Sequence, residues 1–231
     1  MRTRSCATAL ALSIILTTPL VAKEYLSPKA KSGERVVRKA CVMPAEVELA
    51  KAGIKGSEGM TKESDRFAED IRSLVAKKLA DRGVEVNETE LDSAALASSE
   101  DLRQLVLGVQ RKYDTVAPQM HKKPKDIRKG RFTLGDEVAL LPTAARVDTI
   151  VFVHGRGTML TGGKKAFGIL VGGASTDSSG VNVTFVDAKS GDVISMVTLA
   201  SVGGNADDPF AGYSKSMTKA FSKLAMGTGA K

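Results

Sequence analysis

The chain has 231 residues, a length that suits one domain of ordinary core size preceded by a short leader. Trp is absent and aromatic residues make up only 4% of the sequence, so the core is expected to be built from Val, Leu, Ile, Ala and Met. The formal net charge of +8 comes largely from one segment, which excludes a surface that is basic throughout.

The first 22 residues have the organisation of a secretory signal peptide. Arg2 and Arg4 precede an uncharged stretch of 18 residues, Ser5 to Ala22, which ends in an acceptable cleavage site. We therefore expect residues 1–22 to be removed and the mature protein to be exported to a bacterial periplasm or cell envelope. An uncleaved anchor is the alternative, because 18 uncharged residues are just long enough to span a bilayer.

Removal of the leader would take Cys6 with it and leave Cys41 alone. An intramolecular disulfide and a cysteine metal site are then excluded. Cys41 lies in an apolar strand pattern, which predicts a buried and inert thiol. It is not preceded by a lipidation motif at the export site.

The first part of the mature chain predicts a linker and then a strand, a helix and a strand. Residues 23–34 predict a flexible linker, and residues 35–231 a single domain. A strand over 35–43, stopped by Pro44, is followed after a loose stretch by a helix that Thr61 or Ser64 would cap and that Gly83 would end. The apolar stripe of this helix is Phe67, Ile71, Leu74, Val75 and Leu79. A short strand over 84–87 then completes a parallel crossover.

The middle of the chain predicts two further helices. One begins at Ser98 or Ser99 and fades toward Pro118, and the other covers Leu134 to Val147 with Pro142 as its limit.

The centre of the fold is expected at Asp148–His154, where a continuous apolar run predicts a strand buried on both faces and ended by residues 155–157. Strands near 181–187 and 192–200 form a hairpin, and Asp207 or Asp208 begins a last helix. The buried stripe of that helix is Phe210, Met217, Phe221 and Leu224. The predicted fold is α/β: a mixed five-stranded sheet with helices packed on it, built as strand-helix-strand, helices, a three-strand antiparallel meander and a C-terminal helix.

No catalytic, cofactor or metal site is predicted. The strand that ends in His154 and Gly155 resembles an oxyanion strand of α/β-hydrolases, but no Gly-x-Ser-x-Gly elbow exists. Residues 157–164 nearly match a phosphate-binding loop, but they lack the magnesium-binding hydroxyl and join two strands. His121 and His154 lie on different elements with no third ligand of matched spacing, so we expect His154 to be a hydrogen-bonded residue at a strand end.

Two segments are left as candidate contact sites. Residues 111–131 hold eight basic and two acidic residues, and the rest of the mature chain is neutral. They could contact lipid phosphates, anionic cell-wall polymer or nucleic acid. Nucleic acid is the weakest of the three candidates, because few aromatic residues interleave with the charges. Alternatively, these residues form only a solvated loop. The residues that would bind an anionic partner are Lys122, Lys123, Lys125, Arg128, Lys129 and Arg131.

The second segment is a glycine-rich loop over residues 161–180 with an apolar centre. This centre would either cover the edge of the sheet or contact a membrane or partner. Its apolar contact residues are Phe167, Ile169, Leu170 and Val171.

Two stretches carry a resemblance to a known group of proteins. Residues 147–155, Val-Asp-Thr-Ile-Val-Phe-Val-His-Gly, and residues 185–193, Phe-Val-Asp-Ala-Lys-Ser-Gly-Asp-Val, resemble the signatures of exported bacterial lipoprotein-like α/β domains. The curli secretion channel protein and the amino-terminal domain of the Tol-system β-propeller protein have this architecture. The resemblance covers roughly residues 35–226 and implies a part in an envelope assembly or export system, with ring formation as one form of it and no cofactor.

The predicted function is that of an exported, non-catalytic envelope component, an interaction module or an accessory to assembly or export. Its expected partners are an envelope protein, an anionic membrane or cell-wall surface, or further copies of the chain. The alternative is a hydrolase or nucleotide-dependent enzyme of unknown substrate.

Overall fold

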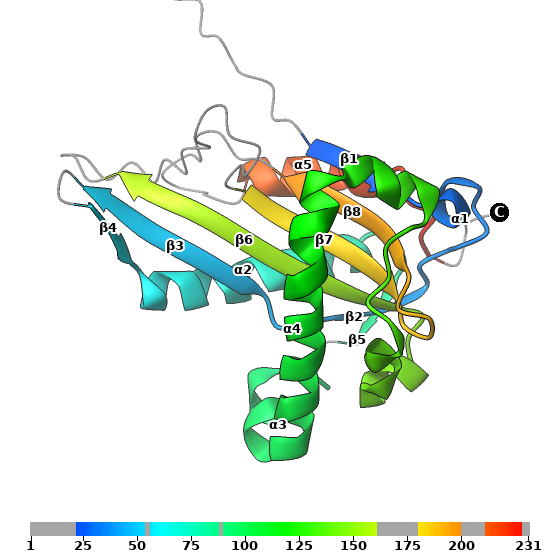
Figure 1. Ribbon diagram of the computed structural model, residues 1–231, viewed down its shortest axis with the longest axis horizontal. Helices are drawn as coiled ribbons and strands as arrows, with labels where there is room; N and C mark the ends of the chain where they lie inside the picture. Colours follow the sequence, from blue (N-terminus) through cyan, green and yellow to red (C-terminus); the bar gives the residue numbers. More distant parts are fainter. Residues whose placement is uncertain (1–21, 54–55, 88–89, 161–179, 200–210, 228–231) are drawn as a thin grey trace, which may run out of the picture.

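The computed structural model describes residues 22–53, 56–87, 90–160, 180–199 and 211–227, which form one mixed sheet with helices on both faces (Figure 1). The strands are β1 (Ala22–Leu26), β2 (Lys39–Val42), β3 (Glu46–Gly53), β4 (Gly56–Gly59), β5 (Glu85–Asn87), β6 (Thr149–Leu160), β7 (Gly180–Asp187) and β8 (Val193–Leu199). The helices are α1 (Pro28–Lys31), α2 (Thr61–Ala80), α3 (Ser93–Ser98), α4 (Glu100–Lys122) and α5 (Ala211–Phe221), with 3-10 helices η1 (Pro124–Lys129), η2 (Asp136–Leu140) and η3 (Pro142–Ala145).

The sheet has the predicted mixed character and a larger size. Its strand order is β1-β8-β7-β6-β2-β5, with β3 also paired to β6 and β4 paired to β3. The antiparallel meander β6-β7-β8 and the parallel neighbours β2 and β5, joined through α2, confirm the predicted topology. The described residues contain eight strands, where the pattern predicted five.

Strand β6 is the centre of the sheet and is longer than expected. It does not end at residues 155–157 but continues to Leu160, because two successive strands use the same edge. β2 pairs with residues 149–151 and β3 with residues 154–160, both in parallel. Pro44, which has no N–H to donate, lies between them. Gly155 allows the Val47 side chain to pack closely against β6, because a Cβ at position 155 would lie 3.1 Å from that side chain.

The two faces of the sheet bury separate cores. Val151 and Val153 face α2 and α5, while Ile150 and Phe152 face α4 and the 3-10 helices, and all four are 0% exposed. Figure 1 shows α4 crossing the sheet on one side and α2 lying on the other. The predicted burial of this strand on both faces is therefore confirmed.

The segment expected to be a linker is part of the fold. Residues 22–26 form β1, which pairs antiparallel with β8 and makes an edge of the sheet. Ser27 then caps α1 by accepting a hydrogen bond from the Ala30 N–H at 3.4 Å, and Ala30 is buried. The linker prediction for residues 23–34 is wrong because a polar edge strand has a composition close to that of a linker. Residues 1–21 of the predicted leader lie outside the described residues, and its last residue, Ala22, is the first residue of β1.

Helix α2 confirms its prediction, although neither expected cap is used. The position before the helix is Met60, and no side chain caps it. Ser64 instead donates its hydroxyl to the Met60 carbonyl at 2.7 Å and accepts from the Leu49 N–H at 2.9 Å, which fixes β3 to the helix.

The two later helices differ from expectation. Ser99 caps α4 as predicted, but the helix passes Pro118 and reaches Lys122, because Met120 beyond the proline is fully buried in the core. The helix expected over 134–147 is replaced by η2 and η3. Leu141 is extended between them, as a residue before proline prefers to be. No helix among the described residues is long and apolar enough to cross a membrane.

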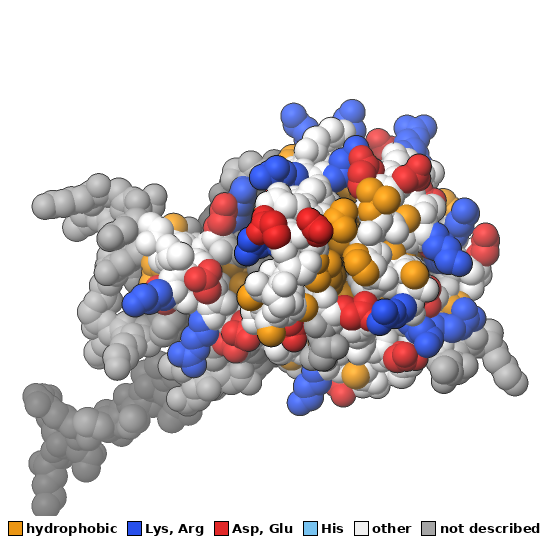
Figure 2. All heavy atoms as spheres, turned by 90° about the horizontal axis from the view of Figure 1, so that it is seen from below, with side chains coloured by type: hydrophobic (Ala, Val, Ile, Leu, Met, Phe, Trp, Pro, Cys, Tyr) orange, Lys and Arg blue, Asp and Glu red, His pale blue; other side chains and the backbone are white. Residues whose placement is uncertain are grey.

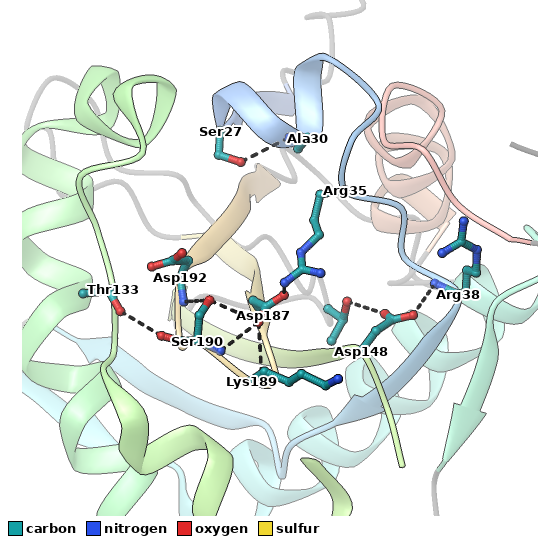
Figure 3. A network of polar contacts seen from close by, with 11 residues as sticks. Ser27, Ala30, Arg35, Arg38, Thr133, Asp148, Asp187, Lys189, Ser190 and Asp192 are labelled. Atoms are coloured by element: carbon teal, nitrogen blue, oxygen red, sulfur yellow. Dashed lines mark hydrogen bonds and ion pairs between the residues drawn. The ribbon is translucent and has the colours of Figure 1, made fainter. Parts of the chain in front are cut away.

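The predicted turn between β7 and β8 is held by Asp187 (Figure 3). This buried carboxylate accepts hydrogen bonds from the Lys189 and Ser190 N–H groups at 3.0 and 2.8 Å and forms an ion pair with Arg35. Gly191 completes the turn at a φ of 69°, a conformation that favours glycine. These contacts confirm that the turn residues have a structural role.

Close by in Figure 3, Asp148 accepts a hydrogen bond from the Arg38 N–H at 3.0 Å. It also accepts one from the Lys39 N–H at 3.0 Å, and the two bonds tie the start of β6 to β2. At the other end of the chain, α5 buries Met217 and Phe221 as predicted, and Leu224 is buried just beyond the end of the helix. Its expected start at residues 207–210 lies outside the described residues.

Candidate functional site

Six exposed basic residues lie on and beside η1 and are called the basic surface below. Lys122 ends α4, Lys123 follows it, Lys125, Arg128 and Lys129 lie within η1, and Arg131 comes just after. The expected solvated loop is thus a helix end and a 3-10 turn. The structure brings together all six residues that the sequence predicted.

The basic surface has a fixed backbone. Ile127, the buried residue of η1, is 1% exposed, and Gly130 ends the turn in a left-handed conformation at a φ of 64°. Arg128 extends over the ring of Tyr25 in β1, with its guanidinium carbon 5.4 Å from the ring centroid, a cation–π arrangement. This unit packs against β1, β8 and α4, so the charges are displayed from a defined position.

Only part of this charge is compensated within the molecule. Asp126 lies 3.5 Å from Lys129 and 3.6 Å from Arg131. Both cations are more than half exposed, so these pairs contribute little to stability. Lys122, Lys123 and Lys125 form no ion pair with any described residue. The surface therefore has positive charge available for an external anion.

The second polar site lies where α4 passes over β3 and β6. Glu46 and His154 occupy paired positions of β3 and β6, and Asp114 comes from α4. His154 Nδ1 lies 3.6 Å from Glu46 Oε2 and 3.7 Å from Asp114 Oδ1. One potential ligand atom from each of the three residues lies within 4.8 Å of the others. We call these three residues the carboxylate–histidine cluster.

Aromatic packing fixes the histidine of this cluster. The Tyr113 ring lies 4.4 Å from the His154 ring and stacks on Phe152 at 4.6 Å, centroid to centroid. The buried Tyr113 hydroxyl shares a 2.8 Å hydrogen bond with Thr184 on β7. His154 is consequently held against α4 with 21% of its side chain exposed.

Burial shapes the charge state of the cluster. Burial, with Arg156 and His121 nearby, lowers the pKa of His154 to about 4, so its imidazole is neutral at neutral pH. Burial also raises the pKa of Glu46, and the Asp114 carboxylate adds to the effect. The pKa of Asp114 is raised too, first by burial and then by Glu48, against the opposing charge of Arg156.

Three polar atoms around the cluster lack a hydrogen-bond partner among the described residues. They are His154 Nε2, Gln110 Oε1 on α4 and Asn182 Oδ1 on β7, and all three atoms are buried. Asn182 stands opposite His154 in the antiparallel register. The expectation of a fully hydrogen-bonded His154 is therefore wrong.

The sequence did not predict this cluster. It requires β3 to lie along the second half of β6, whereas residues 44–59 have the composition of a loose loop with three glycines. Asp114 was grouped with the basic segment, and only its position after Tyr113, on the face of α4 toward the sheet, places it beside His154.

A shallow groove lies between α4 and η2, on the face seen in Figure 2, where hydrophobic side chains gather among charged ones. Leu105, Val109 and Leu140 line it, and Leu140 is 63% exposed. Lys112 and Glu137 form a 3.4 Å ion pair across it. Its described lining contains Asp101 and Arg111 besides this pair, and no histidine or cysteine. The apolar loop residues Phe167, Ile169, Leu170 and Val171 lie outside the described residues.

No protein-family model and no curated protein matches this chain. Among solved structures, it is similar to the PelC dodecamer from Paraburkholderia phytofirmans, with 12% identity, 89% of this chain and 98% of that chain covered, and a TM-score of 0.40. A second crystal form, of a PelC variant, gives 12% identity, coverage of 92% and 100%, and a TM-score of 0.41. A DUF4136 family protein from Bacteroides thetaiotaomicron gives 6% identity, coverage of 88% and 95%, and a TM-score of 0.41.

Proposed function

We propose that the chain is an exported, non-catalytic envelope component that binds an anionic surface of the envelope through the basic surface. The observation that carries the proposal is the concentration of six exposed cations on and beside one short, anchored turn. The leader-like residues 1–22 support export.

Phosphate-bearing surfaces fit this display best. Lys122, Lys123, Lys125 and Lys129 are point charges on flexible stems, and such side chains contact phosphates without requiring one fixed geometry. Few aromatic side chains accompany them, so the stacking used to bind single-stranded nucleic acid is not provided. Lipid phosphates and phosphate-rich cell-wall polymers share the chemistry that this surface would recognise.

The size of the effect can be worked out from the charge. Each lysine close to an anionic bilayer contributes about 1 kcal/mol, so four lysines together contribute up to about 4 kcal/mol, close to a thousandfold in affinity. Exposed charges are screened over about 8 Å at physiological ionic strength, so the binding should weaken as salt is added.

The test is cosedimentation of the mature protein with vesicles at low and at physiological salt. One set of vesicles contains an anionic phospholipid, a second contains only zwitterionic lipid, and a soluble polyphosphate chain serves as competitor. The variant replaces Lys122, Lys123, Lys125 and Lys129 by Gln. Arg128 is left in place because it packs on Tyr25. The control replaces four exposed lysines on α2 and α5, which lie on the other face of the sheet, by Gln: Lys62, Lys77, Lys215 and Lys219.

We expect the wild type and the control variant to bind anionic vesicles at low salt, and the basic-surface variant to lose most of that binding. Competition by polyphosphate would identify phosphate as the recognised group. Binding to the anionic vesicles and not to the zwitterionic ones would favour anionic lipid as its source. Equal binding by both variants, or no binding by the wild type, would show that the basic surface is only solvated.

A further inference from the structure

The carboxylate–histidine cluster lies apart from the basic surface and has no part in the function proposed above. We propose that Glu46, Asp114 and His154 bind one divalent transition-metal ion, for which zinc is the suitable probe. The three side chains come from β3, α4 and β6, three elements that the fold brings to one point.

The spacing of the ligand atoms supports a metal ion better than a hydrogen-bonded network. His154 Nδ1 lies 3.6 and 3.7 Å from the two carboxylate oxygens, which is longer than a hydrogen bond. Two ligands bound at about 2.0–2.1 Å to one tetrahedral ion are separated by roughly 3.3 Å. Each carboxylate oxygen is therefore within a few tenths of an ångström of that separation from Nδ1, and the ligand atoms of Glu46 and Asp114 lie within 4.8 Å of each other.

The second nitrogen of the histidine supplies an independent observation. A metal-bound histidine usually donates its other ring N–H to an acceptor, which fixes its orientation. His154 Nε2 is buried and has no such acceptor among the described residues. Asn182, at the paired register position of β7, holds a buried Oδ1 that also lacks a partner. Both atoms are therefore buried polar groups beside the cluster that the described residues leave unpaired.

The set of donors selects the class of ion. Magnesium and calcium prefer all-oxygen shells, whereas one imidazole with two carboxylates suits zinc and its first-row neighbours. The Glu46 and Asp114 side chains are 43% and 49% exposed, so one side of the site opens to solvent. Water can complete the coordination there, as it does in sites with three protein ligands.

Such an ion would connect α4 to the sheet. Asp114 is the cluster member from the helix, and Glu46 and His154 belong to the long β3–β6 pair that extends past α4 in Figure 1. A ligand that binds only the folded chain stabilises it in proportion to its concentration over its dissociation constant. Zinc should therefore raise the thermal midpoint.

The experiment uses mature protein without an affinity tag, stripped of metal by a chelator and dialysed. Zinc, magnesium and calcium are titrated separately by calorimetry at neutral pH, and the thermal midpoint is measured with and without each ion. The test variants are Glu46→Gln, Asp114→Asn and His154→Asn. Glu137→Gln, which removes an exposed carboxylate in the groove beyond α4, is the control. His121→Asn tests separately the other histidine, which lies near His154.

We expect one zinc ion per chain, a higher thermal midpoint with zinc, and at least about tenfold weaker binding in each test variant, the size of effect seen when a metal site is perturbed. Glu137→Gln should bind within about twofold of the wild type. Should His154→Asn fail to fold, Asp114→Asn, whose side chain is half exposed, still decides the question. No stoichiometric zinc binding, equal binding by the test variants, equal affinity for magnesium, or loss only in His121→Asn would each overturn the proposal.

Discussion

The turn at Gly191 gives a sharp test of how tightly the β7–β8 hairpin is fixed. Gly191 donates its N–H to the Asp187 carbonyl at 2.9 Å, and its own carbonyl accepts from the Leu134 N–H at 2.8 Å. A Cβ at this position would lie 2.1 Å from the Gly135 carbonyl oxygen and 2.8 Å from its nitrogen. These are backbone atoms, so Gly191→Ala cannot be accommodated by a side-chain rotation.

Gly33 is the matched control. Its φ of 78° is close to the 69° of Gly191, but a Cβ there would meet nothing within 4 Å. The left-handed conformation costs alanine about 1–2 kcal/mol, whereas the smaller conformational freedom of the unfolded chain stabilises the variant by about 0.4–1 kcal/mol. Gly33→Ala should therefore lower the free energy of unfolding by about 1 kcal/mol. Overpacking adds about 1–3 kcal/mol, so Gly191→Ala should lose about 2–4 kcal/mol.

Urea denaturation followed by circular dichroism measures both losses. The unfolding midpoint should fall clearly further for Gly191→Ala than for Gly33→Ala, with unchanged slope. A difference between the two variants below about 0.5 kcal/mol would refute the reasoning, because it would mean that Gly135 moves aside at no cost.

Two further predictions concern the core. Phe152→Ala should lose about 3–5 kcal/mol of stability in the same assay, because Phe152 is fully buried and stacked on Tyr113. Leu140→Ala, at an exposed position, should change stability by less than about 0.5 kcal/mol. A loss under about 1 kcal/mol for Phe152→Ala would show that β6 is not central. Burial raises the pKa of Cys41 to about 11, so the folded mature protein should resist iodoacetamide at pH 8 and react once it is unfolded in guanidinium. Rapid labelling of the folded protein would contradict the burial of Cys41.

The elements that the sequence predicted well are those set by local pattern. Helix α2 shows its apolar stripe at helical spacing, and the β7–β8 hairpin shows two apolar runs around a turn in which Asp187 accepts from two nearby N–H groups. The continuous apolar run of β6 also predicted that this strand is buried on both faces, as the structure shows. Each of these signals lies within about twenty residues of sequence and needs no distant partner.

The elements that were missed depend on distant partners. β1 was taken for a linker because an edge strand needs few apolar residues: Ala22 and Leu26 pack toward one core and Tyr25 toward the other, all only partly buried. β3 was missed because its glycine-rich surroundings obscure a strand that exists through its pairing with β6.

The candidate sites divide in the same way. The basic surface could be found by counting charge, although the buried Ile127 that anchors it gave no signal in a charged segment. The carboxylate–histidine cluster joins three residues that are far apart in sequence, and only the parallel pairing of β3 with β6 and the crossing of α4 bring them together.

The pairing of β1 with β8 also bears on the timing of folding. The first described strand completes the sheet by pairing with the last one, so this contact must wait until nearly the whole chain has been synthesised. Residues 22–26 have no folded partner before then. The segment next to the predicted cleavage site would thus lack its sheet partner during most of synthesis.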